Sequence, residues 1–305
     1  MQEKSIAGVV GRFAPSPTGE LHFGSLLAAL GSYLDARSRN GEWLVRIENI
    51  DPPREVDGAG LRQIETLARH GLESDRDVVW QIDSTARHEQ AIAALVDRGL
   101  AFHCGCTRAD LPESGRYPGT CRRDLPTGRS ARSIRLLVDE QSVNFDDAIQ
   151  GHCVQCPATE CGDFVIRRAD GLIAYQLAVV VDDASAGVTD VVRGSDLIES
   201  TARQILVYRA LGLDPPRYGH LPLVVDESGR KLSKSESDDP IRHGAPDGNL
   251  RRALNCLGHP PPSDLKTIEE LLEWGVANWR VGKVPRGPCP IPDAPRRKMP
   301  IGGII

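Results

Sequence analysis

Two polar loops in this sequence have the residue types needed to hold the phosphates of a nucleotide. The first covers residues 15–25, Pro-Ser-Pro-Thr-Gly-Glu-Leu-His-Phe-Gly-Ser, between an expected strand at Val9–Phe13 and an expected helix at Gly24–Arg37. A helix N-terminus offers free N–H groups and the positive end of a dipole, which suit a phosphate. Gly24 allows close approach of a ligand, and His22 can donate to phosphate oxygens as charge develops. An ordinary strand-to-helix loop is the alternative.

The second loop covers residues 229–235, Gly-Arg-Lys-Leu-Ser-Lys-Ser. Lys231 and Lys234 could clamp a triphosphate and neutralise leaving pyrophosphate. Such a segment alone is weak evidence, because most lysine-rich loops are simply solvated. A His-x-Gly loop followed about 200 residues later by this loop resembles the two-part signature of class I aminoacyl-tRNA synthetases. The pair therefore predicts ATP binding, with Mg²⁺ on the phosphates.

The elements around these loops indicate an α/β fold with a parallel sheet, because apolar strands alternate with helical patterns. Strands are expected at residues 9–13, 43–47, 164–166 and 178–181, the last being a near-continuous apolar run that suits a buried strand. Helices are expected at residues 24–37, 200–211, 249–257 and 267–279. Residues 229–239 read as a loop, and the proline-rich tail after Lys283 is expected to be poorly ordered.

Composition excludes several other classes of protein. The chain has 305 residues, with 40% hydrophobic and 26% charged, which is typical of a soluble globular protein. No apolar run reaches the ~20 residues that a membrane helix needs, and the polar N-terminus does not resemble a signal peptide, so we expect a cytoplasmic protein. The net charge of −5 does not attract nucleic acid. Six arginines between Arg116 and Arg135 could still bind phosphate, although a solvated loop explains them equally well.

Several motifs resemble the glutamyl/glutaminyl branch of the class I synthetases. Residues 12–25 match its nucleotide loop, and residues 46–55, Arg-Ile-Glu-Asn-Ile-Asp-Pro-Pro-Arg-Glu, look like its acidic motif. Residues 22–26 and 175–183 are most similar to the glutamyl-queuosine tRNA(Asp) synthetase family. The similarity extends from about Val9 to Val284. Only about 70 residues follow Lys234, too few for the anticodon-binding part of a full glutamyl-tRNA synthetase.

The resemblance implies an enzyme that activates glutamate with ATP and transfers it to queuosine in the anticodon loop of tRNA(Asp), acting as a monomer. It implies catalytic roles for His22, Lys231 and Lys234. The implied ATP-binding residues are His22, Gly24, Ser25, Lys231 and Lys234. The implied glutamate-binding residues are Arg12, Phe13, Ala14, Pro15, Ser16, Glu48, Tyr175 and Arg193. The chemistry fits, because two arginines can pair with two carboxylates, Glu48 can take the ammonium group, and Tyr175 can donate its hydroxyl.

Two positions depart from the pattern of this branch. Ser25 stands where class I loops usually have a second histidine, and Asn49 stands where we expect aspartate. Three other functions therefore stay open. They are a truncated enzyme that charges tRNA(Glu), a small-molecule adenylyltransferase, and a tRNA-binding protein without activity.

The eight cysteines are expected to be metal ligands or core thiols rather than disulfides. Cys104, Cys106 and Cys121 can hold one structural zinc ion, which needs a fourth ligand. The family resemblance implies that this ligand is Tyr117, and His103 is the alternative. Cys153, Cys156 and Cys161, with His152, also have ligand-like spacing, but free thiols are the favoured interpretation; Cys256 and Cys289 look isolated.

These observations predict a Rossmann-like class I catalytic domain with a zinc-bearing insertion and a short helical C-terminal part. The expected boundaries are residues 1–102 for the nucleotide-binding half, 103–135 for the zinc-binding insertion, 136–240 for the second half with the glutamate pocket, and 241–305 for the C-terminal part.

Overall fold

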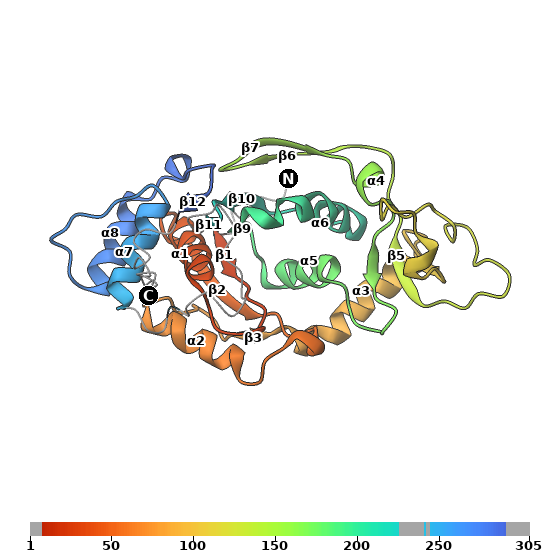
Figure 1. Cartoon of the computed structure of the whole chain (residues 1–305), viewed down its shortest axis with the longest axis horizontal. Helices are drawn as coiled ribbons and strands as arrows, with labels where there is room; N and C mark the ends of the chain where they lie inside the picture. Colours follow the sequence, from red (N-terminus) through yellow and green to blue (C-terminus); the bar gives the residue numbers. More distant parts are fainter. Residues whose placement is uncertain (1–7, 226–240, 242–244, 291–305) are drawn as a thin grey trace, which may run out of the picture.

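A five-stranded parallel sheet forms the centre of the computed structural model, which describes residues 8–225, 241 and 245–290 (Figure 1). The strand order is β10-β9-β1-β2-β3. Their bounds are β1 Val10–Phe13, β2 Glu42–Ile47, β3 Val79–Trp80, β9 Asp190–Gly194 and β10 Arg217–Leu221. From β1 the chain adds strands on one side and later returns to add strands on the other. Ligands of such sheets bind beyond the carboxyl ends of the strands at this reversal point.

Helices cover both faces of this sheet (Figure 1). On one face lie α1 (Phe23–Arg37), α7 (Pro246–Cys256) and α8 (Ile268–Asn278), and on the other lie α5 (Tyr175–Ala186) and α6 (Ile198–Leu211). The leucines of α1 at positions 26, 27, 30 and 34 are fully buried in the main core. The other helices are α2 Ala59–Arg69, α3 Thr85–Asp97, α4 Pro157–Glu160 and the short 3₁₀ turns Pro52–Arg54, Gln81–Ser84, Arg108–Asp110, Ser195–Leu197 and Val281–Lys283.

Three small sheets complete the described structure. An antiparallel sheet contains β4 (Ala101–Cys104), β5 (Ser133–Leu136) and β8 (Val165–Arg167), at the end of the molecule remote from α8 (Figure 1). The other two sheets are the hairpin of β6 Val143–Asp147 with β7 Gly151–Gln155, and the parallel pair of β11 Val224–Val225 with β12 Cys289–Pro290. The domain boundaries at residues 102, 135 and 240 stay predictions. None of the described helices has the length and apolarity to cross a membrane.

Most of the expected elements are confirmed. The strands expected at 9–13, 43–47 and 164–166 are β1, β2 and β8, and the helices expected at 24–37, 200–211, 249–257 and 267–279 are α1, α6, α7 and α8, with ends shifted by a few residues at most. Thr267 is the N-cap of α8 and forms a capping box with Glu270. The loop expected at residues 229–239 lies outside the described residues.

The strand expected at Ala178–Val181 is wrong, because these residues lie in helix α5. A short apolar run cannot distinguish a buried strand from a helix that is buried on all sides. Helix α5 is of the second kind, since every residue from Gln176 to Asp183 is buried. Gly187 ends the helix in the left-handed conformation, at φ 72°.

The expectation for two cysteines is also wrong, and so is the expectation for the first residues of the tail, 284–290; residues 291–305 lie outside the described part of the chain. Val284 is buried, and the chain beyond it continues into β12. Cys256 at the end of α7 and Cys289 in β12 form a disulfide with a Cα–Cα distance of 5.7 Å. They are 33 residues apart in sequence, and the pairing of β12 with β11 brings them together, which local patterns cannot reveal.

Candidate active site

A cavity of about 210 Å³ opens at the reversal point of the parallel sheet. It is bordered by the carboxyl ends of β1 and β9 and by the N-terminus of α1. Ten of the predicted site residues line it: Arg12, Phe13, Ala14, Pro15, His22, Gly24, Ser25, Glu48, Tyr175 and Arg193. Lys231 and Lys234 lie outside the described residues. Strand β11 lines the cavity at Val224. The fold thus brings one set of distant motifs to a single place.

The nucleotide loop ends at the N-cap of α1, which is His22. Its ring Nδ1 accepts a hydrogen bond from the backbone N–H of Ser25 at 3.3 Å. In the neutral ring the proton therefore lies on Nε2, which suits a donor to phosphate oxygens. A side chain at position 24 would place its Cβ 3.0 Å from the His22 ring, so glycine at this position leaves the histidine in place.

A buried ion-pair chain links β1, β2 and α5 on one side of the cavity. The carboxylate of Asp183 accepts from Nε of Arg12 at 3.3 Å and from Nη1 of Arg46 at 2.7 Å. Arg46 also donates to Glu48 at 3.2 Å. Burial raises the pKa of Glu48, although Arg46 and Arg12 act in the opposite direction. An ammonium ion bound beside Glu48 would stabilise the ionised form of this carboxylate.

Arg193 and Tyr175 also line the cavity. Nη1 of Arg193 donates to the Tyr175 hydroxyl at 3.4 Å, and Nη2 donates to Oγ1 of Thr201 at 3.0 Å. Burial is the largest influence on Tyr175 and raises the pKa of its phenol, which therefore stays protonated. Two guanidinium groups, a carboxylate and a phenol thus converge on one small cavity.

Ser16, a predicted glutamate-binding residue, and Asn49, a departure from the family pattern, do not line the cavity. The carbonyl of Ser16 accepts from the side-chain amide of Gln63 at 3.1 Å. Asn49 accepts from the backbone N–H of Ile82 at 3.1 Å, a contact that an aspartate could also make. The departure at Asn49 therefore leaves this loop contact intact.

Sequence reasoning missed three residues near the cavity: Arg46, Asp147 and His220. Arg46 stands in the motif that contains Glu48, so its charge in an apolar strand was an available signal. Asp147 and His220 come from a hairpin and a strand 73 residues apart, and no local pattern joins them. Asp182, next to Asp183, binds His88 at 2.9 Å and Gln81 at 2.8 Å.

The sequence that forms this cavity matches a known family over most of its length. The model of the catalytic domain of class I tRNA synthetases (E and Q) matches residues 8–255. A protein of Chromobacterium violaceum named glutamyl-Q tRNA(Asp) synthetase is 50% identical over 289 residues, which cover 92% of this chain and 97% of that protein. This chain belongs to the glutamyl-Q tRNA(Asp) synthetase family. A protein of Ectopseudomonas mendocina with the same name is 49% identical over 91% of this chain and 95% of its own length.

Solved structures confirm the fold of this glutamyl-Q tRNA(Asp) synthetase family member. A glutamate tRNA ligase from Elizabethkingia meningosepticum, solved in complex with its amino acid, superposes with a TM-score of 0.80 at 24% sequence identity. The match covers 94% of this chain and 67% of that ligase. The chain therefore has the catalytic fold of a class I tRNA synthetase, as the sequence predicts.

The cysteine cluster of this family member has the geometry of a metal site. The thiols of Cys104, Cys106 and Cys121 are buried and lie within 4.8 Å of one another, the one such group of potential ligands in the described residues. The Tyr117 hydroxyl is 3.5 Å from the sulfur of Cys104. Burial raises the pKa of Cys104, but hydrogen bonds from Tyr117, the Cys106 N–H and an arginine outweigh it, and the pKa is lowered to about 7. Three thiols and a hydroxyl around one point could hold a metal ion.

The other candidate ligands lie elsewhere. His103 is exposed and adjoins Cys104 in strand β4, so its side chain points to the opposite face. The thiols of Cys153 and Cys161 contact backbone carbonyls of nearby residues, and neither belongs to the described ligand group. Of the two candidates for a fourth ligand, Tyr117 is therefore the one that lies beside the cluster.

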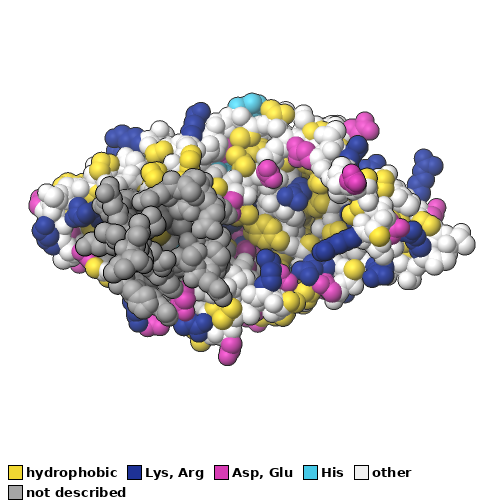
Figure 2. Space-filling view, in the orientation of Figure 1, with side chains coloured by type: hydrophobic (Ala, Val, Ile, Leu, Met, Phe, Trp, Pro, Cys, Tyr) yellow, Lys and Arg dark blue, Asp and Glu magenta, His cyan; other side chains and the backbone are white. Residues whose placement is uncertain are grey.

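A basic groove of about 890 Å³ lies between the cysteine cluster and the acidic-motif loop, and it is lined by Arg54, Arg108, Arg132, Arg135 and Arg168 among others. Figure 2 shows basic side chains over the half of the surface that carries α3, α5 and β5. Arg122 makes two bonds to the buried Asp163, at 2.6 and 2.8 Å, so this member of the arginine-rich segment supports the fold. Arg132 is exposed on the groove wall.

Proposed function

We propose that this protein activates glutamate with ATP and transfers it to queuosine in the anticodon loop of tRNA(Asp). The observation that supports this most is the convergence of Arg12, Glu48, Tyr175 and Arg193 on one cavity beside the nucleotide loop. The names of relatives at about 50% identity over nine-tenths of the chain support the acceptor.

The pocket suits glutamate because its charges complement those of the amino acid. Arg12 and Arg193 would each pair with one carboxylate, and Glu48 would hold the ammonium group. The remaining predicted contacts come from Tyr175 and from the loop residues Phe13, Ala14, Pro15 and Ser16. Because Arg12 is already held by Asp183, its guanidinium group is oriented before the substrate arrives.

In the first step a glutamate carboxylate oxygen would attack the α-phosphorus of ATP. The new bond is an acyl–phosphate bond, and the bond between the α-phosphorus and the bridging oxygen breaks to release pyrophosphate. His22 would donate from Nε2 to phosphate oxygens, with Gly24 and Ser25 contributing the N-terminus of α1. Lys231 and Lys234 would neutralise the charge that grows on the pyrophosphate. Mg²⁺ bound with ATP would supply further charge on the phosphates.

In the second step a queuosine hydroxyl would attack the acyl carbonyl, so that an ester forms and AMP leaves. This transfer requires the anticodon loop to enter the active site directly. The groove that contains Arg132 would then contact the phosphate backbone. We infer that the protein acts in the cytoplasm as a monomer, and that one zinc ion held by Cys104, Cys106, Tyr117 and Cys121 stabilises the wall of this groove.

The test uses glutamate-dependent exchange of pyrophosphate into ATP, followed by transfer to purified tRNA. Exchange should occur without tRNA. Labelled glutamate should appear on tRNA(Asp) that contains queuosine and should persist after periodate oxidation of the terminal ribose, which blocks ordinary charging. Labelling of unmodified tRNA(Glu) would instead favour a truncated tRNA-charging enzyme. Absence of exchange would indicate a protein that binds tRNA without activity.

A further inference from the structure

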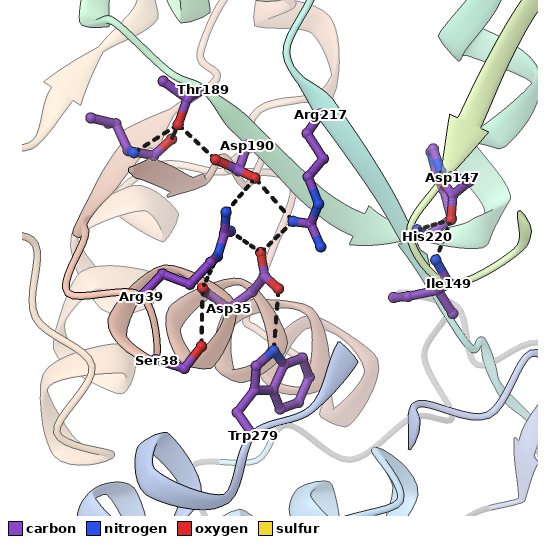
Figure 3. A network of polar contacts seen from close by, with 11 residues as sticks. Asp35, Ser38, Arg39, Asp147, Ile149, Thr189, Asp190, Arg217, His220 and Trp279 are labelled. Atoms are coloured by element: carbon purple, nitrogen blue, oxygen red, sulfur yellow. Dashed lines mark hydrogen bonds and ion pairs between the residues drawn. The ribbon is translucent and has the colours of Figure 1, made fainter. Parts of the chain in front are cut away.

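The buried imidazole of His220 contacts Arg193 but does not line the active-site cavity. Its ring Nε2 accepts a hydrogen bond from Nε of Arg193 at 3.1 Å. Its Nδ1 lies 2.6 Å from Oδ2 of Asp147 (Figure 3). His220 and Asp147 come from different elements, β10 and the end of β6. Any effect of this pair on a ligand in the cavity must therefore pass through Arg193.

The hydrogen-bond chemistry fixes the tautomer of His220. A guanidinium group has donors only, so Nε2 of the ring must offer a lone pair to Arg193. In the neutral ring the proton then lies on Nδ1 and is donated to Asp147. The other oxygen of Asp147 accepts hydrogen bonds from the backbone N–H of Ile149 at 3.0 Å (Figure 3) and from that of Gln150 at 2.8 Å, and these bonds hold the carboxylate in place.

Arg193 is consequently held along its whole guanidinium group. His220 holds Nε, Thr201 and the carbonyl of Leu197 hold Nη2, and Tyr175 contacts Nη1. An arginine that is fixed in this way loses little rotational freedom when it binds a carboxylate. The alternative is a purely structural contact that leaves the affinity for the ligand unchanged.

We propose that Asp147 and His220 are positioning residues that orient Arg193 for glutamate. This inference rests on the proposed function, because it takes the Arg193 guanidinium group as a ligand for a glutamate carboxylate. Asp147 selects the ring tautomer, the tautomer gives Arg193 an acceptor, and the acceptor sets the plane of the guanidinium group.

The same arrangement predicts a dependence on pH. A second proton on the ring would bind at Nε2 of His220. This nitrogen would then present an N–H to Nε of Arg193, which is also a donor, and the hydrogen bond between them would be lost. The charged and titratable groups that face the ring are Asp147, Arg193 and Arg12, and Tyr218, which stacks on it at 6.2 Å between centroids. Burial lowers the pKa of His220, the two arginines lower it further, and Asp147 opposes them. Below the ordinary value of 6.5, protonation should release Arg193 and raise the KM for glutamate.

Two variants test the inference in the exchange assay. In Asp147→Asn the side-chain amide can donate to Nδ1, which would move the ring proton to Nε2 and toward Arg193. The KM for glutamate should rise about 10-fold or more, with the KM for ATP unchanged. In His220→Gln the amide oxygen can still accept from Arg193 but does not titrate. Its KM for glutamate should stay near that of the wild type at neutral pH. At acid pH this KM should rise less than in the wild type, because only the protonation of Glu48 would still weaken binding.

His259→Gln is the matched control. His259 is buried and has the same pattern of contacts, with Nδ1 at 2.8 Å from the carbonyl of Leu257 and Nε2 accepting from the N–H of Arg280 at 3.0 Å. It does not line the cavity. This variant should lose thermal stability as the two test variants do, but keep the KM for glutamate and its pH profile.

Nitrogen-15 NMR of the ring gives a readout that needs no catalysis. The wild type should show a protonated Nδ1 and a bare Nε2, and Asp147→Asn should shift the proton to Nε2. A wild-type ring protonated at Nε2, or a folded Asp147→Asn variant with normal KM for glutamate, would overturn the inference and leave the proposed function intact. If Asp147→Asn does not fold, the test is the pH dependence of the KM for glutamate in His220→Gln. A dependence as steep as that of the wild type would overturn the inference. A wild type without exchange would contradict the proposed function itself.

Discussion

The indole Nε1 of Trp279 donates a hydrogen bond to the buried carboxylate of Asp35 at 3.2 Å (Figure 3). The other oxygen of Asp35 accepts from Arg217 at 2.8 Å, and Arg217 also pairs with Asp190 at 2.9 Å. Arg39 joins the same network. One carboxylate in α1 thereby connects the end of α8 with strands β9 and β10, which carry Arg193 and His220. The C-terminal helices are thus attached to the sheet that forms the active site.

We predict that Asp35→Asn lowers the free energy of unfolding by about 1–3 kcal/mol, because the buried side chain loses charge-assisted hydrogen bonds to Arg217 and Arg39. Both arginines are partly exposed and keep Asp190 as a counter-charge, which limits the loss. Urea denaturation measures this. The control is Glu42→Gln, since the pair of Glu42 with Arg76 is about half exposed and its loss should cost about 0–1 kcal/mol. Equal effects of the two substitutions would show that the Asp35 network does not stabilise the fold.

Purified protein should contain one zinc ion per chain by elemental analysis. Cys121→Ser should lose the metal and lower the melting temperature, because structural zinc contributes folding free energy. Cys161→Ser is the matched control and should retain the ion, since the hydrogen bonds of its thiol go to the backbone carbonyls of Pro157 and Gly162 and it lies outside the group of three thiols. Two ions per chain would instead favour a second site at Cys153, Cys156 and Cys161. Protein without metal would exclude the first site.

Lys234→Ala should lower the rate of glutamate-dependent exchange about 100-fold or more, with a smaller change in the KM for glutamate. The lysine is expected to act on charge that develops in the transition state, so its loss affects turnover more than binding. Arg69→Ala, in an exposed pair with Glu65, provides the control. An unchanged exchange rate would remove Lys234 from the mechanism.

Transfer to tRNA should fall steeply with added salt, whereas adenylation should change little. Contacts to the phosphate backbone of the RNA release condensed counterions, and glutamate activation makes no contact to that backbone. Arg132→Gln should weaken transfer and reduce the slope of log affinity against log salt by about 1, without affecting exchange. Arg69→Ala should leave the slope unchanged. An equal slope in the two variants would show that the groove does not contact the RNA backbone.

Stability should decrease as the pH falls from 7.5 to 5.5. Burial is the largest influence on His70, His220 and His259, and it lowers the pKa of each below 6.5. The unfolded chain therefore binds more protons than the native chain in this range. The free energy of unfolding decreases as pH falls, by up to about 1.4 kcal/mol per pH unit for each group. Urea midpoints at several pH values test this, and a midpoint that rises on acidification would contradict it.

The sequence alone determined the motifs and most of the regular elements. Residues 12–25 identify the nucleotide loop because helix start, glycine and histidine are adjacent in the chain. The cysteines at 104, 106 and 121 are also close in sequence, so their grouping needed no long-range information. The spacing of apolar residues predicts the type of element correctly where one face of the element meets solvent. Helix α7 is an example, because its buried residues recur at helical spacing.

Tertiary structure decided the features that depend on contacts between distant segments. Residues 178–181 are apolar throughout, so their pattern does not distinguish a strand from a helix, and the structure places them in a helix that is buried on all sides. The disulfide of Cys256 with Cys289 depends on the pairing of β12 with β11. His220 became a neighbour of Arg193 because β10 lies beside β9, and Asp147 joined them from a hairpin. Local patterns report the periodicity of one segment, whereas these partners are chosen by packing across the sheet.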